Sequence, residues 1–458
     1  MHRRVYLHTL GCEKNEADSR GMRSLLRQAG YELVDSVEHS DAVVINTCGF
    51  IEPAVEESVS AIVQACDLKN AGGVDKVVVV GCLVSRSGPE LREQLPEVDV
   101  FLGTAAYHKI VRALRPDAEP LADAMASAHY LFEAPLPQAD EASTYAWVKI
   151  GEGCSRDCSF CTIPSFRGRQ RSKRPESVIE ELKHLAGLGV QEAILVSQDS
   201  TQYGQDLRDG TSLIGLLERI EAEPDLPTRV RLHYTFPGRM VQEIIPLLGQ
   251  ARRLCAYLDM PIQHTDPAIL QAMHRPRDRD WLLRTLTDAR ARYPHMWMRS
   301  TVIVGHPGET EASIQQLAED LELIGFDYLS AFRWSPEQGT TAAQLPASYE
   351  LQHSREWLTQ ITGRQADITE RRLRSRLGQV LEVLIDRQGE DGAWEGRTVG
   401  QSPNVDGAVL VEGLLRPGQI VAVRIEDVIG PDLFGSVASG RGLGGIPILP
   451  ESAFGPRN

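Results

Sequence analysis

Three closely spaced cysteines in the middle of the chain are the strongest candidates for chemistry. Cys154, Cys158 and Cys161 form a C-x3-C-x2-C array directly after an apolar run at 145–150 that predicts a strand. A four-iron, four-sulfur cluster is usually held by four cysteines. Three thiolates on one loop would therefore hold three irons and leave the fourth iron open to a small molecule.

A second set of three cysteines is dispersed through the first hundred residues. Cys12, Cys48 and Cys82 each follow a predicted strand, at 5–9, 41–46 and 76–80 respectively. Because the carboxyl ends of parallel strands share one edge of a sheet, we expect these cysteines to meet in space. A second iron-sulfur cluster is one interpretation. Small buried core residues and a zinc site are the others, although no fourth zinc ligand is obvious.

The two remaining cysteines have a structural interpretation. Cys66 shares one face of a predicted helix at 53–68 with apolar residues, which is typical of a core position. Cys255 begins a short apolar run and has no cysteine neighbour in sequence.

The elements that position these cysteines predict an α/β protein of about three domains in its 458 residues. We expect a Rossmann-like parallel sheet at 1–116, a linker at 117–143 and a partial, six-stranded (β/α) barrel at 144–372. A small antiparallel β-barrel at 375–440 and a tail at 441–458 complete the chain.

The expected elements of the second and third domains alternate regularly. Barrel strands are predicted at 145–150, 192–197, 229–234, 256–260, 300–304 and 328–332, and helices at 175–188, 212–221, 240–248, 281–292, 311–324 and 355–376. Five short strands follow at 379–386, 393–399, 408–412, 419–427 and 433–437. The cysteine loop and the segment Ser197-Gln198-Asp199 both follow barrel strands, so we expect them at the carboxyl-terminal rim, where such barrels bind ligands.

Composition and charge exclude several classes of protein. Hydrophobic residues make up 42% and charged residues 24% of the chain, and no apolar run is long enough to predict a membrane span. Clustered cysteines without a signal segment indicate the cytoplasm, where thiols stay reduced. The net charge of -15 disfavours a general nucleic-acid binder, whose surface is basic.

The carboxyl-terminal module is strongly acidic. Residues 379–437 contain ten acidic and four basic residues, a net charge of -6. Small barrels often bind RNA, but this charge would repel the phosphate backbone and favours a basic protein partner. The clearest basic run follows the cysteine loop and contains Arg167, Arg169, Arg171, Lys173 and Arg174. Such a run is most often a solvated face, with a contact to a macromolecular partner or the substrate as the alternative.

Nearly the whole chain resembles the methylthiotransferase family. The segments Gly11-Cys12, Thr47-Cys48-Gly49 and Gly81-Cys82 resemble its three amino-terminal cysteine motifs. The segment from Gly153 to Gly168, with Cys158-Ser159-Phe160-Cys161, resembles its radical S-adenosylmethionine (SAM) core, and the last barrel resembles a TRAM domain. The RimO type is the most similar, on the motifs Ile163-Pro164-Ser165-Phe166-Arg167-Gly168, Ser197-Gln198-Asp199-Ser200 and Pro403-Asn404-Val405-Asp406-Gly407.

This resemblance implies an activity and a set of cofactors. The RimO type adds a methylthio group to the β-carbon of an aspartate of ribosomal protein S-twelve. It uses two 4Fe-4S clusters, and SAM serves both as methyl donor and as the source of a 5′-deoxyadenosyl radical. By resemblance, Cys154, Cys158 and Cys161 would hold the cluster that binds SAM, and Cys12, Cys48 and Cys82 the cluster that carries sulfur.

Three further residues are expected at the SAM site, and no acid-base pair is assigned. Phe160 occupies the position that commonly contacts adenine in this superfamily, with simple packing as the alternative. Ser197 and Gln198 are the other expected SAM contacts. The expected partners are S-twelve, free or in the small ribosomal subunit, and an electron donor such as flavodoxin or ferredoxin; no specific nucleic acid is expected.

Two other functions stay open. A tRNA adenosine methylthiotransferase would share the cysteines, but we would expect it to carry a basic terminal barrel. An iron-sulfur electron carrier or redox sensor would normally supply four cysteines to each cluster, whereas both sets here contain three.

Overall fold

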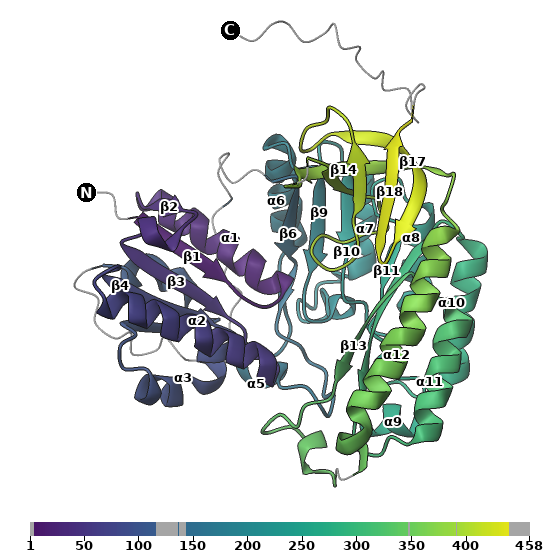
Figure 1. Cartoon of the computed structure of the whole chain (residues 1–458), viewed down its shortest axis with the longest axis horizontal. Coiled ribbons are helices and arrows are strands. Elements are labelled where there is room, and N and C mark those ends of the chain that lie inside the picture. Colours follow the sequence, from purple (N-terminus) through teal and green to yellow (C-terminus); the bar gives the residue numbers. More distant parts are fainter. Residues whose placement is uncertain (1–3, 116–135, 137–142, 347–348, 391, 439–458) are drawn as a thin grey trace, which may run out of the picture.

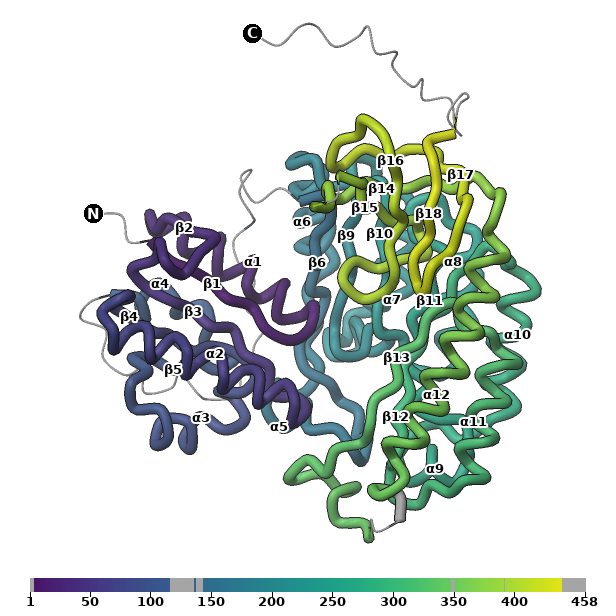
Figure 2. The backbone as a smooth tube through the Cα atoms, viewed as in Figure 1, coloured from purple at the N-terminus to yellow at the C-terminus, as the bar shows by residue number. Residues whose placement is uncertain are grey.

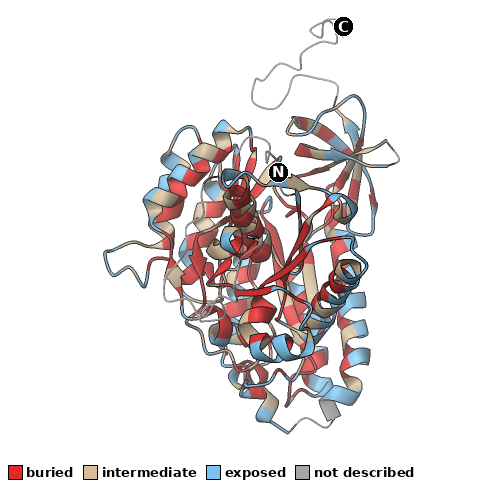
Figure 3. Cartoon of the chain, turned by 90° about the vertical axis from the view of Figure 1, so that its left-hand side faces the viewer, coloured by how far each residue is buried: buried red, intermediate tan, exposed pale blue. Residues whose placement is uncertain are grey.

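A computed structural model describes residues 4–115, 136, 143–346, 349–390 and 392–438. The expected linker at 117–143, apart from residues 136 and 143, and the tail at 441–458 lie outside the described residues. The amino-terminal sheet lies beside the middle domain, and the carboxyl-terminal barrel lies at one end of that domain (Figures 1 and 2). Buried residues follow the strands, whereas exposed residues lie on the outer faces of the helices (Figure 3).

The amino-terminal domain is a five-stranded parallel sheet with the order β2-β1-β3-β4-β5, as the Rossmann-like prediction requires. Its strands are β1 (Arg4–Thr9), β2 (Glu32–Val34), β3 (Ala42–Thr47), β4 (Lys76–Gly81) and β5 (Val100–Gly103). Its helices are α1 (Glu13–Gln28), α2 (Glu52–Asn70), α3 (Cys82–Gln94) and α4 (Ile110–Ala113). Strands β3 and β4 are buried along their whole length, because apolar clusters cover both faces of the sheet.

The middle domain contains six parallel strands in two hydrogen-bonded groups, β10-β9-β6 and β11-β12-β13. They are β6 (Tyr145–Lys149), β9 (Glu192–Val196), β10 (Arg229–Leu232), β11 (Tyr257–Asp259), β12 (Trp297–Val304) and β13 (Tyr328–Arg333). The amide of Cys255 donates to the carbonyl of Val230 at 2.8 Å and joins the two groups. The six-stranded partial barrel of the sequence prediction is therefore confirmed.

Helices connect these strands and cover the outside of the barrel. They are α6 (Pro175–Gly187), α7 (Leu213–Ala222), α8 (Val241–Gln250), α10 (Arg279–Arg292), α11 (Glu311–Ile324) and α12 (Tyr349–Arg374), with short helices α5 (Ile163–Arg167) and α9 (Pro267–Ala272). Local sequence sets the limits of α11. Thr310 and Ser313 form a capping box at its start, and Gly325 ends it at φ +66°, a conformation that glycine adopts without strain.

The carboxyl-terminal domain is a closed five-stranded barrel with the order β14-β15-β16-β18-β17. Its strands are β14 (Val380–Gln388), β15 (Trp394–Arg397), β16 (Val409–Glu412), β17 (Ile420–Ile429) and β18 (Asp432–Val437). All pairs are antiparallel except β16 and β18, which pair in parallel. A buried ion pair from Glu192, at the start of β9, to Arg397 at 2.7 Å fixes this barrel against the middle domain, where Glu192 also pairs with Arg231 at 2.7 Å.

Candidate functional site

The C-x3-C-x2-C loop lies at the carboxyl-terminal rim of the middle domain, beyond β6 and the two-residue strand β7 (Gly151–Glu152). Gly153 has φ +78°, and a side chain there would collide with the backbone oxygens of Gly168 and Arg169. The amide of Cys154 donates to the carbonyl of Gly168 at 3.0 Å, and that of Cys161 donates to the carbonyl of Cys158 at 3.1 Å. These contacts fold the loop so tightly that its three cysteines lie together.

Polar side chains surround the sulfurs of this loop. Gln202 donates to Sγ of Cys154 at 3.7 Å, and Arg275 donates to Sγ of Cys158 at 3.9 Å. The guanidinium groups of Arg156 and Arg275 both lie about 4 Å from the centroid of the Phe236 ring, at 3.9 and 4.0 Å. Burial raises the pKa of the Cys161 thiol to about 12. Bound iron would favour the thiolate, which is the form that coordinates metal.

The dispersed cysteines gather at one edge of the amino-terminal sheet. Cys12 is the N-cap of α1, Cys48 directly follows β3, and Cys82 is the first residue of α3. Gly11 has φ +89°, and a Cβ there would lie 2.6 Å from the Cβ of Cys48, so the glycine permits their close approach. Burial, and secondarily the nearby thiols of Cys12 and Cys48, raise the pKa of Cys82 to about 12. Two helix amino termini at this edge favour bound negative charge.

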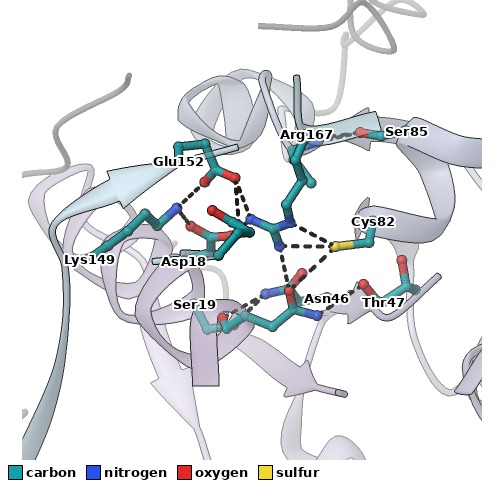
Figure 4. Close-up of polar contacts among 12 residues, drawn as sticks. Asp18, Ser19, Asn46, Thr47, Cys82, Ser85, Lys149, Glu152 and Arg167 are labelled. Atoms are coloured by element: carbon teal, nitrogen blue, oxygen red, sulfur yellow. Dashed lines mark hydrogen bonds and ion pairs between the residues drawn. The ribbon is translucent and has the colours of Figure 1, made fainter. Parts of the chain in front are cut away.

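Arg167 connects the two sets of cysteines (Figure 4). It ends α5, shortly after the cysteine loop, and is 3% exposed. Its Nε and Nη2 donate to Sγ of Cys82 at 3.2 and 3.0 Å, and Nη2 also donates to Oδ1 of Asn15 at 2.8 Å. Its Nη1 donates to Oε1 of Glu152, which precedes the loop, at 2.8 Å. One guanidinium thus contacts a cysteine of one set and the segment that carries the other.

Acids and a lysine complete the buried network around Arg167. Lys149 donates to Glu152 at 2.7 Å and to Asp18. Against the effect of burial, the charges of Arg167 and Lys149 hold the pKa of Glu152 below its usual range. The interpretation of the basic run as a solvated face is therefore wrong for Arg167, and also for Lys173, which is buried and pairs with Glu181 at 2.5 Å. Both cations are buried because carboxylates from neighbouring elements neutralise them.

The residues expected at the SAM site lie at the same rim. Phe160 is partly exposed beside Cys161. Ser197 is buried, with its Oγ 3.4 Å from Oγ of Ser200. The side-chain Nε2 of Gln198 donates to Oε1 of Glu152 at 3.2 Å. The Oε1 of Gln198 is buried without a hydrogen-bond partner among the described residues.

Other buried polar atoms near the rim also lack hydrogen-bond partners within the described part of the chain: Ser159 Oγ, Thr162 Oγ1, Gln263 Oε1 and Thr265 Oγ1. Because buried polar atoms are normally paired, these atoms are suited to a polar ligand such as SAM. Across the described ranges, no three His, Cys, Asp or Glu side chains close around a single metal ion. The donor sets, three thiols each, suit iron-sulfur clusters.

The sequence prediction missed the residues that surround the cysteines. Asn15, Glu152, Gln202 and Arg275 come from four separate segments, and no local pattern links them to the sulfurs.

The described residues contain no helix long and apolar enough to cross a membrane.

Three protein-family models match the chain. They are described as an uncharacterized family, UPF0004, at residues 4–103, the Radical SAM superfamily at 148–321, and the TRAM domain at 377–438. The predicted radical SAM core and TRAM domain are thereby confirmed.

Curated relatives match over nearly their full length. A protein of Anaeromyxobacter sp. (strain K) is 38% identical over 99% of this chain and 98% of its own length, and one of Clostridioides difficile (strain 630) is 36% identical over 95% and 98%. Both carry the name "Ribosomal protein uS12 methylthiotransferase RimO". A solved structure, the radical SAM methyltransferase TsrM from Kitasatospora setae with cobalamin and a [4Fe-4S] cluster bound, is similar in fold. It gives a TM-score of 0.51 at 16% identity, over 72% of this chain and 75% of that one.

Proposed function

Because this chain belongs to the RimO family of ribosomal protein uS12 methylthiotransferases, we propose that it adds a methylthio group to the β-carbon of an aspartate of uS12. It is a radical SAM methylthiotransferase that uses SAM and 4Fe-4S clusters. The observation that carries the proposal is the pair of three-cysteine sets, which Arg167 joins across the two domains.

The two sets have different roles in the proposal. Cys154, Cys158 and Cys161 would hold the cluster that binds SAM, and Cys12, Cys48 and Cys82 would hold the cluster that carries the sulfur. When bound, these groups and SAM supply one-electron reduction, a 5′-deoxyadenosyl radical and a methyl group. Radical chemistry suits this reaction because the β-carbon of aspartate has no proton acidic enough for a general base.

The remaining residues position the two domains, contact SAM and exclude water from the site. The buried network of Arg167, Glu152, Lys149 and Asp18 fixes the amino-terminal sheet against the loop that carries the other cysteines. Phe160, Ser197 and Gln198 are proposed to contact SAM at the rim. No side chain is proposed as an acid or a base.

The charge of the TRAM barrel supports a basic protein as the substrate. Five of its acids and three of its bases are exposed to solvent, so acids predominate: Glu382, Glu390, Glu412, Glu426 and Asp427 against Arg387, Arg416 and Arg424. A phosphate backbone would be repelled by these carboxylates, whereas a basic ribosomal protein would be attracted. This disfavours the tRNA alternative. We further propose that the protein acts in the cytoplasm and takes electrons from a flavodoxin- or ferredoxin-like donor.

Two parallel reactions test which substrate the protein modifies. Anaerobically reconstituted, reduced protein is mixed with SAM and sulfide, and with either a uS12 peptide that contains the target aspartate or bulk tRNA. We expect a methylthio adduct on the peptide, located to the aspartate by fragmentation in a mass spectrometer. Modification of the tRNA but not of the peptide would contradict the proposal.

A further inference from the structure

Lys14 is a buried lysine beside the dispersed cysteines that forms no contact ion pair within the described residues. It is the second residue of α1, two positions after Cys12, and is 8% exposed. Its Nζ lies 3.5 Å from the centroid of the Tyr234 ring, which stands at the rim of the barrel two residues beyond β10. Within the described residues, no carboxylate oxygen lies within 4.0 Å of this nitrogen, and it donates no hydrogen bond.

Other buried lysines near this junction differ from Lys14 in their partners. Lys149 contacts both Asp18 and Glu152, and Lys173 pairs with Glu181 at 2.5 Å. Buried charges in proteins are normally paired in this way, because an unpaired charge loses its hydration without compensation. An aromatic face replaces only part of that hydration. Lys14 therefore retains the capacity to bind an anion.

The nearest acid in sequence, Glu13, makes no direct contact with Lys14, although against the effect of burial the charge of Lys14 lowers the pKa of that carboxyl. Glu13 accepts a hydrogen bond from the hydroxyl of Tyr234 at 2.5 Å, so Tyr234 holds that carboxylate while its ring supports Lys14. Tyr234 itself has φ +61°, a conformation that is strained for a tyrosine, and its amide donates to Asp259 at 2.9 Å. The backbone of the rim is thus held in an uncommon shape that presents this ring to α1.

We propose that the ammonium group of Lys14 binds the side-chain carboxylate of the substrate aspartate. This inference rests on the proposed function and names a residue that would select that substrate. The β-carbon is bonded directly to this carboxylate, so a cation that grips it would hold the β-carbon next to the Cys12 set. An adenosine base has no carboxylate, and the same cation would give it no such contact. A charge-assisted bond of this kind is stronger than one between neutral groups.

Peptide binding tests the inference without turnover. Reconstituted, unreduced protein with SAM bound is titrated with a fluorescent uS12 peptide that carries either the target aspartate or asparagine at that position. We expect the wild type to bind the aspartate peptide about tenfold more tightly than the asparagine peptide. This is the change in affinity expected when one charged hydrogen bond is lost. Lys14→Met should bind both peptides equally, and Lys14→Arg should restore part of the preference.

Controls separate this inference from loss of folding and from the proposed function. Lys183→Met, which removes an exposed lysine paired with Glu223, should keep the wild-type preference and iron content. Equal binding of both peptides by the wild type, or a preference that persists in Lys14→Met, would overturn the role of Lys14; the wild-type comparison decides even where Lys14→Met does not fold. Failure of the wild type to modify the peptide would instead reject the proposed function.

Discussion

The two sets of cysteines are built by different means. Cys154, Cys158 and Cys161 lie within eight residues of one another, and local turns fold them together. Cys12, Cys48 and Cys82 are separated by more than thirty residues each, and the parallel sheet brings them to one edge. The first arrangement depends on a loop, whereas the second depends on a whole domain.

Their surroundings differ as well. The loop sulfurs receive long contacts, such as Arg275 at 3.9 Å, from their own domain. Cys82 receives two contacts of 3.0 and 3.2 Å from Arg167 of the neighbouring domain. The contacts from Arg167 to Cys82 are therefore made only when the middle domain is docked against the amino-terminal domain. The described contacts to the loop sulfurs, in contrast, come from within the middle domain.

The largest expected effect comes from removing the loop set. The triple substitution of Cys154, Cys158 and Cys161 to Ala should abolish reductive cleavage of SAM, because the cluster that binds SAM is lost. Production of 5′-deoxyadenosine, measured by chromatography, should fall to the background of a reaction without protein. The corresponding substitution of Cys12, Cys48 and Cys82 should keep cleavage and lose methylthio transfer. Cleavage of SAM by the loop variant would contradict the division of roles.

Removal of the connection between the sets should have the next largest effect. Arg167→Gln removes the charge that contacts Cys82 and Glu152, and losses of about 10–100-fold are typical when a residue that supports a metal ligand is changed. We expect methylthio transfer to fall by this amount, while SAM cleavage changes less. Arg167→Lys should rescue only part of the loss, because lysine lacks the planar fork that reaches both sites. Equal losses in transfer and cleavage would show that Arg167 does not act on the dispersed set.

Smaller effects are expected at the proposed SAM contacts. Phe160→Leu removes an aromatic surface, and Gln198→Ala removes a partly buried side-chain amide that donates to Glu152. Each should weaken SAM binding by about tenfold or less, the cost of one contact, as measured by equilibrium dialysis with the reconstituted protein. Iron content serves as the control and should stay at the wild-type value. Unchanged SAM affinity in both variants would remove these residues from the site.

The smallest effect is expected at a cysteine outside both sets. Cys66 is buried in the apolar cluster under α2, as its helical position predicts. Cys66→Ala should lower the free energy of unfolding by about 1 kcal/mol, the typical cost of a core change, and leave the iron content and both activities unchanged. Denaturation followed by circular dichroism and an iron assay would check this. A loss of iron would mean that the ligands are assigned wrongly.

Much of the fold could be predicted from the sequence because strand and helix periods are strong here. The strand predicted at 76–80 corresponds to β4, Lys76–Gly81, and the helix predicted at 311–324 has the same limits as α11. The short edge strand β2 and strand β5 were missed, since three or four residues carry too little alternation to be recognised. The parallel pairing of β16 and β18 also depends on closure of the barrel, which no local signal encodes.

The cysteines of the site could be predicted from the sequence, but the buried charges around them could not. The loop cysteines and the edge position of the dispersed cysteines follow from spacing and from the end of each strand. Arg167 and Lys173 were misjudged, because charge in a sequence indicates exposure unless the acids that neutralise it are known. No sequence pattern links those acids, Glu152 and Glu181, to their basic partners. Lys14 is the converse case, a buried charge whose partner among the described residues is an aromatic ring.

Iron content tests the central claim, that two separate clusters occupy the two sets, most directly. The wild type, the Cys154/Cys158/Cys161 variant and the Cys12/Cys48/Cys82 variant are reconstituted anaerobically, desalted and assayed for iron per folded chain. The account predicts about eight irons in the wild type and about four in each variant, since each four-iron cluster is held by one set. Retention of about eight irons by either variant, or only about four in the wild type, would contradict it.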